Sequence, residues 1–264
     1  MGLKKLAKVI GTVAALSFSN IYAQNTNYLS KVEASASKIE KYQKLKNAGI
    51  IKGIIYNPSK QELSTLASNI FSQVKSKDTF LLKAGDLGEC VSNAVKRMSS
   101  LDSFSVSIFP LPSPVAYGNQ VPRYIIFGKD FPLCFENKNE YDLQAVVKHE
   151  LVHVLDAYFG IPIKTTSKRG FLKEEVLIPL GEVRADYYIL KEILKEGKLN
   201  NSEGFFKKNV GHYLENIYRL NSQLLRGSEY EKQVITSTLN DFSDIGFTKD
   251  SINQISVGLR QKNK

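Results

Sequence analysis

Residues 148–156 read KHELVHVLD and contain residue types that could bind a metal ion. The chain has only three histidines, and two of them, His149 and His153, stand four residues apart here. On an α-helix, positions i and i+4 lie on the same face, so both imidazoles could bind one ion. Glu150 could reach a water on that ion without being a ligand. The HExxH spacing therefore predicts two zinc ligands and a general base.

The same segment could instead be an ordinary amphipathic helix with two half-buried histidines. Histidine is rare in this chain, which makes a chance match to the motif less frequent. Two charged imidazoles that face each other would also repel, so a close pair needs a reason to exist. Both arguments favour the metal site.

A catalytic zinc ion needs a third protein ligand, with its fourth position left open. We expect this ligand to be Glu182, in the segment GEVRADYY of the next predicted helix. Asp186 lies four residues later on the same helix face and could accept the free ring N–H of a zinc-bound histidine. Other acidic residues compete for the ligand role: Asp156, Glu174, Glu175 and Asp186 itself.

The combination of HExxH with a downstream ExxxD helix resembles the gluzincin zinc metallopeptidases, of which thermolysin is a member. The form ExxAD, here residues 182–186, is especially similar to the CAAX-prenyl endopeptidase family. The form HExxHxxD, with Asp156 after the second histidine, also looks like the anthrax lethal-factor-like domains. The resemblance covers residues 123–190. The membrane helices of the CAAX enzymes have no counterpart here, so their substrate class is not carried over.

This resemblance implies a zincin-like fold in which His149, His153 and Glu182 bind zinc and Glu150 is the general base. It also implies that Asp186 orients His149. The segment RYIIFG (123–128) would be the sheet edge beside the HExxH helix, where a peptide substrate could add as an extra strand.

A hydrolase of this kind needs a further donor for the tetrahedral oxyanion. His212 is the one remaining histidine, and thermolysin-like enzymes use a downstream histidine in this way. We therefore name His212 as the second candidate catalytic residue beside Glu150, although a packed or surface histidine is the simpler interpretation. Four tyrosines are alternatives: Tyr158, Tyr187, Tyr188 and Tyr213.

The helices that must position these residues follow from the spacing of apolar residues. A continuous apolar face predicts a helix over 139–160, which ends at the glycine before Pro162. The next helix is predicted to start with Pro179 at its first position and to run to Gly197. Most of the chain after residue 200 has a helical pattern.

The first half of the chain mixes strands and helices. Strands are predicted at 49–56, 79–82, 103–109 and 123–128, and helices at 28–47, 59–75 and 86–101. Ser59 and Glu62 have the spacing of a capping box. The pattern predicts an α+β fold with a small twisted mixed sheet and a helical C-terminal half. We expect a sheet-containing subdomain over 24–160 and a helical subdomain over 161–264.

Residues 1–23 have the features of a signal peptide: a lysine-rich start, an apolar core and a cleavage site after Ala23. An uncleaved membrane anchor is the alternative, but the apolar run is short for a transmembrane helix. We expect an exported protein, periplasmic or extracellular, without stable membrane insertion. In that compartment Cys90 and Cys134 are expected to form a disulfide, with two buried thiols as the alternative.

The chain is 42% hydrophobic and 23% charged, as in ordinary globular proteins, and carries a formal net charge of +10. The basic residues are spread out and do not alternate with aromatic residues, so no nucleic-acid partner is expected. The sequence predicts an exported metallopeptidase with one Zn²⁺ per chain, which hydrolyses peptide or protein substrates by zinc-activated water. The alternatives are a non-catalytic zincin-fold binding protein and a metal-dependent hydrolase of a cell-wall amide.

Overall fold

A computed structural model describes residues 28–72, 86–99, 106–110, 121–131, 140–159, 172–195 and 203–242. Residues 28–37 are helical. The elements that follow are, in chain order, α2 (Glu40–Asn47), β1 (Ile51–Tyr56), α3 (Lys60–Ser72), α4 (Asp86–Ser99), β2 (Val106–Phe109), β3 (Arg123–Phe127), α5 (Glu140–Phe159), α6 (Glu174–Lys195), α7 (Glu203–Leu224) and α8 (Glu229–Asp241). The described part is mostly helical with one small mixed sheet, which is compatible with the predicted α+β class.

The sheet has three described strands in the order β1-β3-β2. Strand β3 pairs with β1 in parallel and with β2 in antiparallel orientation. The expectation that the segment from Arg123 is the sheet edge is therefore wrong, because β3 is hydrogen-bonded on both sides. Its consecutive residues Ile125, Ile126 and Phe127 are all buried, as is typical of a strand covered on both faces. A peptide cannot add to β3, since both of its edges are occupied.

Different helices cover the two faces of the sheet. Alternate side chains of a strand point to opposite faces. Ile108 and Ile125 pack on one face with residues of α2 and α5. Phe109 and Ile126 pack on the other face with residues of α3 and α4. Helix α5 is thus fixed to the sheet along one side, and this leaves its opposite side for the histidines.

Several predicted helices of the first half are confirmed, with local corrections. The predicted helix over 28–47 is interrupted at 38–39, and its glycine terminator Gly49 has the left-handed φ of 72° that glycine adopts readily. The capping box of α3 is present, since the Glu62 carboxylate accepts from Ser59 N and Glu62 N donates to Ser59 Oγ. The predicted strand at 79–82 lies outside the described residues.

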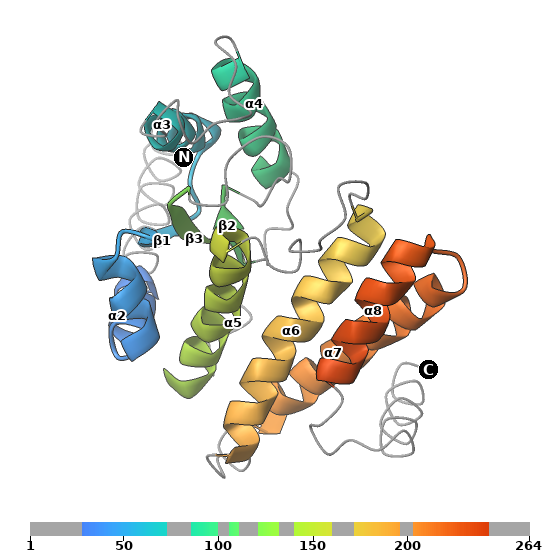
Figure 1. Cartoon of the computed structure of the whole chain (residues 1–264). Coiled ribbons are helices and arrows are strands. Elements are labelled where there is room, and N and C mark those ends of the chain that lie inside the picture. Colours follow the sequence, from blue (N-terminus) through green and yellow to red (C-terminus); the bar gives the residue numbers. More distant parts are fainter. Residues whose placement is uncertain are drawn as a thin grey trace, which may run out of the picture.

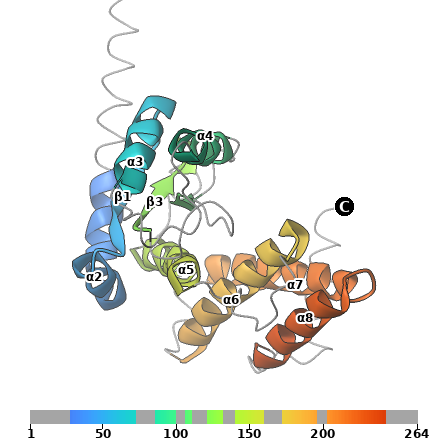
Figure 2. The same cartoon turned by 45° about the horizontal axis from the view of Figure 1, so that its top comes forward.

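Helix α5 lies between the sheet and the helices α6, α7 and α8 (Figures 1 and 2). Its sheet-facing side chains, Leu143, Val147, Leu151 and Val154, are buried in the same core as the strands. On another side, Ala145 packs against Ile189 and Ile193 of α6. These two contact surfaces on one helix fix α6 against the side of α5 that carries the metal-binding motif.

The helical half has its own apolar core, built from α6, α7 and α8. Helix α6 begins at Glu174, so the expectation that Pro179 is its first residue is wrong. The proline is tolerated because it lies close to the helix start, where only one intrahelical hydrogen bond is lost. An acidic residue at the start, Glu175, also suits the positive end of the helix dipole.

Some predictions concern residues that the structure does not describe. The signal peptide, its cleavage site, Cys134 and the side chain of Cys90 are among them, so export and the disulfide stay predictions. Within the described ranges, no helix is both long enough and apolar enough to cross a bilayer.

Besides the histidine contacts described below, lysine and arginine ion pairs connect α5 to α6 among the described residues. Lys148 pairs with Glu192, and Arg184 Nη2 donates to Asp156 Oδ1 over 2.9 Å. The Asp156 and Arg184 side chains are only 10% and 15% exposed. The Arg184 guanidinium also lies 5.6 Å from the centre of the Phe242 ring, at the end of α8. Burial raises the pKa of Asp156 to about 6, although Arg184 opposes this shift.

The variant Asp156→Ala is expected to lower the free energy of unfolding by about 3–5 kcal/mol, because the nearly buried charge of Arg184 would lose its partner. Chemical denaturation above pH 7, where Asp156 is ionised, measures this loss. The matched control is Glu215→Ala, which removes the exposed partner of Arg219 and should cost less than about 1 kcal/mol. Equal losses in the two variants would contradict the assignment of Asp156 and Arg184 as a buried charge pair.

Candidate metal centre

All three histidines of the chain meet in one cluster at the junction of three helices. Helix α5 supplies His149 and His153, α6 supplies Glu182 and Asp186, and α7 supplies His212. The ring centroids of His149 and His153 are 4.8 Å apart, and those of His149 and His212 are 6.5 Å apart. The helix repeat explains the first pair, whereas the approach of His212 depends on the packing of α7 against α6.

One atom from each of His149, His153 and Glu182 lies within reach of a common ion. The two histidine Nε2 atoms are 3.1 Å apart. Glu182 Oε2 is 3.2 Å from His149 Nε2, and Glu182 Oε1 is 3.5 Å from His153 Nε2. Two ligand atoms at about 2.0–2.1 Å from a tetrahedral zinc ion lie roughly 3.3 Å from each other. The three residues therefore form a cluster that could hold a metal ion.

The cluster is accessible without lying on the open surface. The side chains of His149, His153 and Glu182 are 15%, 17% and 25% exposed. A catalytic metal site needs such an opening, because its fourth position must admit water or substrate. A purely structural site would be closed by a fourth protein ligand.

The charges in the cluster favour a bound cation. Burial alone would lower the pKa of His149, but Asp186 and Glu182 outweigh it and hold this pKa well above its usual value. Burial also opposes a charged His153, and again Glu182 raises its pKa overall. Burial would raise the pKa of Glu182, but His153 and His149 hold it well below its usual value. The carboxylates thus stabilise positive charge between the imidazoles, whether protons or a metal ion carry it.

Glu150 has the environment of a proton acceptor. Its side chain is buried, with 6% of the residue exposed. Burial raises the pKa of Glu150 to about 7, while the charges of His153 and His149 act in the opposite direction. A carboxyl group whose pKa is close to neutral can both accept and release a proton near pH 7.

Asp186 lies between two imidazoles. Its side chain is completely buried, and Oδ1 is 3.2 Å from His149 Nδ1. His212 Nδ1 donates to Asp186 Oδ2 over 2.8 Å. A carboxylate beside the second ring nitrogen of a metal-binding histidine fixes the ring and its tautomer. The hydrogen bond to Asp186 also raises the pKa of His212, against the effect of burial.

Two of the other acidic candidates for the third ligand lie elsewhere, whereas Asp186 lies in the cluster beside the second ring nitrogen of His149. Asp156 pairs with Arg184, and Glu175 is exposed on the first turn of α6. Two of the four tyrosines proposed as oxyanion donors have other hydrogen-bond partners. The Tyr213 hydroxyl donates to the Phe242 carbonyl, and the Tyr187 hydroxyl accepts from Lys191. Of the candidates weighed, the structure brings Glu182, Asp186 and His212 to the two HExxH histidines.

The double contact of Asp186 is the feature that sequence reasoning missed. The i+4 spacing from Glu182 predicts one histidine partner, but no pattern links Asp186 to a residue 26 positions later on another helix. The rarity of histidine was the available signal. Because two of the three histidines stand in the metal-binding motif, the third was the first residue to consider as a further member of the site.

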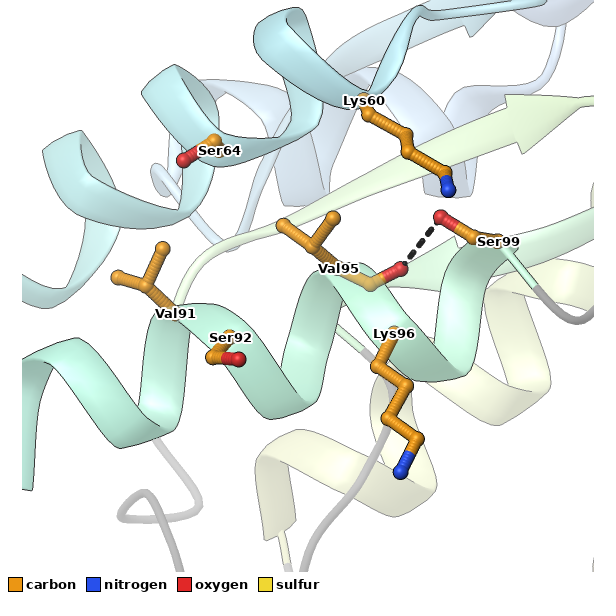
Figure 3. Close-up of a pocket in the computed structure, with 7 residues that line it drawn as sticks. All are labelled: Lys60, Ser64, Val91, Ser92, Val95, Lys96 and Ser99. Carbon is orange, nitrogen blue, oxygen red and sulfur yellow. Dashed lines mark hydrogen bonds between the residues drawn. The ribbon is translucent and has the colours of Figure 1, made fainter.

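A separate groove of about 610 Å³ lies between α3 and α4 (Figure 3). Its lining consists of lysines, serines and valines: Lys60, Ser64, Val91, Ser92, Val95, Lys96 and Ser99. Figure 3 shows Lys60 reaching from α3 toward Ser99, whose hydroxyl donates to the Val95 carbonyl over 2.8 Å. None of these residues is a histidine or an acid, so the groove lacks the ligand types that meet between α5 and α6.

No protein-family model, no curated protein and no solved structure matches this chain. The function is therefore argued from the chemistry and geometry of the site itself.

Proposed function

We propose that this chain is a zinc-dependent metallopeptidase of the gluzincin type with a zincin-like fold. The observation that carries the proposal is the convergence of His149, His153 and Glu182, whose ligand atoms lie 3.1–3.5 Å apart. Two of these residues come from the HExxH segment and the third from a helix that starts 21 residues after the second histidine. Such a set of three ligands with a partly open position is the arrangement of catalytic zinc sites.

Zinc is the metal that these donors favour. Two imidazole nitrogens and one carboxylate oxygen are the ligands of catalytic zinc in metallopeptidases. Magnesium and calcium prefer sites made of oxygen atoms alone. Imidazole also suits copper, nickel and iron, so the exclusion of these metals depends on geometry and on metal supply.

The residues around the ion have separate roles in the proposed hydrolysis. A bound zinc ion acts as a Lewis acid that polarises the scissile carbonyl and lowers the pKa of water. Glu150 accepts the proton of the attacking water and passes it to the leaving amine. In the metal-free chain, burial raises the pKa of Glu150 to about 7, so this carboxyl group can exchange protons near neutral pH. His212 donates to the oxyanion that develops on the carbonyl oxygen, and its 45% exposed side chain allows contact with a substrate.

The proposed substrate is a peptide or protein outside the cytoplasm, which combines the resemblance to peptidases with the expected signal peptide. A hydrolase of cell-wall amides would use the same metal and the same general base. Only the bond that is cleaved separates the two, because the catalytic residues are shared.

The test is cleavage of fluorogenic peptide libraries by the mature chain, residues 24–264, after loading with zinc. We expect turnover that a zinc chelator abolishes and that added zinc restores. Peptidoglycan-derived stem-peptide amides form the parallel substrate set. Faster cleavage of those amides than of every peptide pool would replace the peptidase assignment with the cell-wall alternative. Zinc-independent turnover, or none on either set, would count against a zinc hydrolase.

A further inference from the structure

The carboxylate of Asp186 has an arrangement that a single positioning role does not explain. Its side chain is completely buried, and each of its two oxygens lies beside a different imidazole. Oδ1 is 3.2 Å from His149 Nδ1, which is an ion-pair distance without hydrogen-bond geometry, and Oδ1 has no hydrogen-bond partner among the described residues. Oδ2 accepts from His212 Nδ1 at 2.8 Å. The two oxygens are thus divided between the two rings.

The orientation of the two rings shows which nitrogen atom of each histidine faces Asp186. In both histidines the Nδ1 atom faces Asp186, so the Nε2 atom is the one that remains for other partners. For His149, Nε2 is the ligand atom beside Glu182. For His212, Nε2 is correspondingly the atom that can meet a substrate, and the side chain is 45% exposed. Glu182 Oε2 lies 3.9 Å from His212 Nδ1, which is beyond hydrogen-bonding distance, whereas Asp186 Oδ2 is hydrogen-bonded to that atom.

We propose that Asp186 is a shared positioning residue, whose two oxygens hold the metal-ligand His149 and the substrate-facing His212 in register with each other. The substrate-facing role of His212 rests on the proposed function, whereas the shared hold on the two rings does not. Because one rigid carboxylate contacts both rings, a shift of either ring changes the position of the other. The four-residue spacing between Glu182 and Asp186 predicts only the contact of Asp186 with His149. It does not predict the contact with His212.

The substitution Asp186→Asn separates the two contacts with little change in volume. An asparagine has one carbonyl oxygen and one NH₂ group, so it can accept from only one of the two Nδ1–H groups. The other ring then faces a donor and loses its fixed tautomer. A residue that served His149 alone would allow the amide to turn its oxygen to that ring without consequence for His212.

The first measurement is ¹⁵N NMR of the imidazole rings, which is practical because the chain has only three histidines. In the parent, with or without zinc, we expect both His149 and His212 to carry a persistent Nδ1 proton. In Asp186→Asn, at least one of these protons should be lost, and the His212 ring signals should shift. The parent spectrum decides the question even if the variant fails to fold, because a His212 ring without a persistent Nδ1 proton would overturn the proposal.

The second measurement is zinc affinity, by competition with a chromophoric chelator. Asp186→Asn should weaken zinc binding by roughly 10–100-fold, the usual effect of losing a carboxylate behind a histidine ligand. His212→Ala should change it far less, because His212 is not a ligand. The matched control is Asp156→Asn, another buried aspartate between α5 and α6 that contacts Arg184 instead of a histidine.

The possible results lead to distinct conclusions. If Asp186→Asn weakens zinc binding while the His212 signals stay unchanged, Asp186 serves His149 alone and the shared role is overturned. If Asp156→Asn produces the same changes, the effect belongs to the helix interface and the proposal is also overturned. If the parent binds no zinc, the proposed function fails, but the metal-free spectra of His149 and His212 still decide whether Asp186 holds both rings.

Discussion

Replacing Glu182 with alanine is expected to weaken zinc binding by roughly a hundred- to a thousand-fold. The substitution removes the oxygen atoms that lie 3.2 Å and 3.5 Å from the two histidine Nε2 atoms. Binding free energies of zinc sites with four protein ligands are about 10–16 kcal/mol, so one ligand accounts for roughly 2.5–4 kcal/mol. A tenfold change in affinity corresponds to about 1.4 kcal/mol, which gives the expected range.

Elemental analysis and chelator competition measure this effect. The parent should bind one zinc ion, whereas Glu182→Ala should lose it at chelator concentrations that leave the parent loaded. Glu175→Ala is the matched control, because Glu175 lies two turns earlier on the same helix and is exposed. Its zinc affinity should equal that of the parent. Full zinc retention by Glu182→Ala would transfer the ligand role to another acid, and a parent without zinc would remove the metal centre altogether.

The sequence was sufficient for the part of the site that depends on local geometry. His149 and His153 share a helix face because of the α-helical repeat, and the apolar stripe beside them predicts that helix over nearly its observed length. The proximity of Glu182 is different, because it requires α6 to pack against α5 through Ala145 and Ile189. Glu182 was indicated in advance by its place on the next predicted helix, four residues before Asp186, and by the resemblance to a known arrangement of ligands, but neither shows that the two helices pack together.

The wrong position of the strand and the missed contact of Asp186 have the same physical origin. Both depend on which distant segments pack beside a residue, and a local sequence pattern does not contain this information. The segment from Arg123 reads as a strand, but its sequence does not state which strands lie on either side of it. Three consecutive apolar residues, Ile125–Phe127, are typical of a central strand, whereas the expectation of a sheet edge came only from the resemblance. The link from Asp186 to His212 likewise depends on the packing of α7, which brings together residues 26 positions apart.

The substitution Glu150→Gln is expected to lower turnover by roughly a hundred- to ten-thousand-fold while zinc stays bound. The amide keeps the size of the side chain but cannot accept the proton of the attacking water, and general-base catalysis contributes about this factor. Zinc affinity should stay close to that of the parent, because Glu150 is not one of the three clustered ligands. Loss of zinc together with activity would mean that Glu150 binds the metal.

Glu150→Gln also has an expected effect on stability that needs no substrate. In the metal-free parent the pKa of Glu150 is raised from the ordinary 4.5 to about 7, chiefly by burial. Between these values the folded chain binds more protons than the unfolded chain, so this group makes the parent less stable as pH rises through the window. The shift corresponds to roughly 3 kcal/mol, which is lost in full above pH 7.

The glutamine variant lacks this titration, and all other titrating groups are common to both proteins. The stability of Glu150→Gln relative to the parent should therefore increase by roughly 3 kcal/mol from below pH 4.5 to above pH 7. Denaturation of the chelated proteins at both ends of this range measures the difference. A difference that does not change with pH would show that the Glu150 carboxyl has an ordinary pKa. Without its raised pKa, Glu150 would lose the property that suits it to accept and then release a proton near neutral pH.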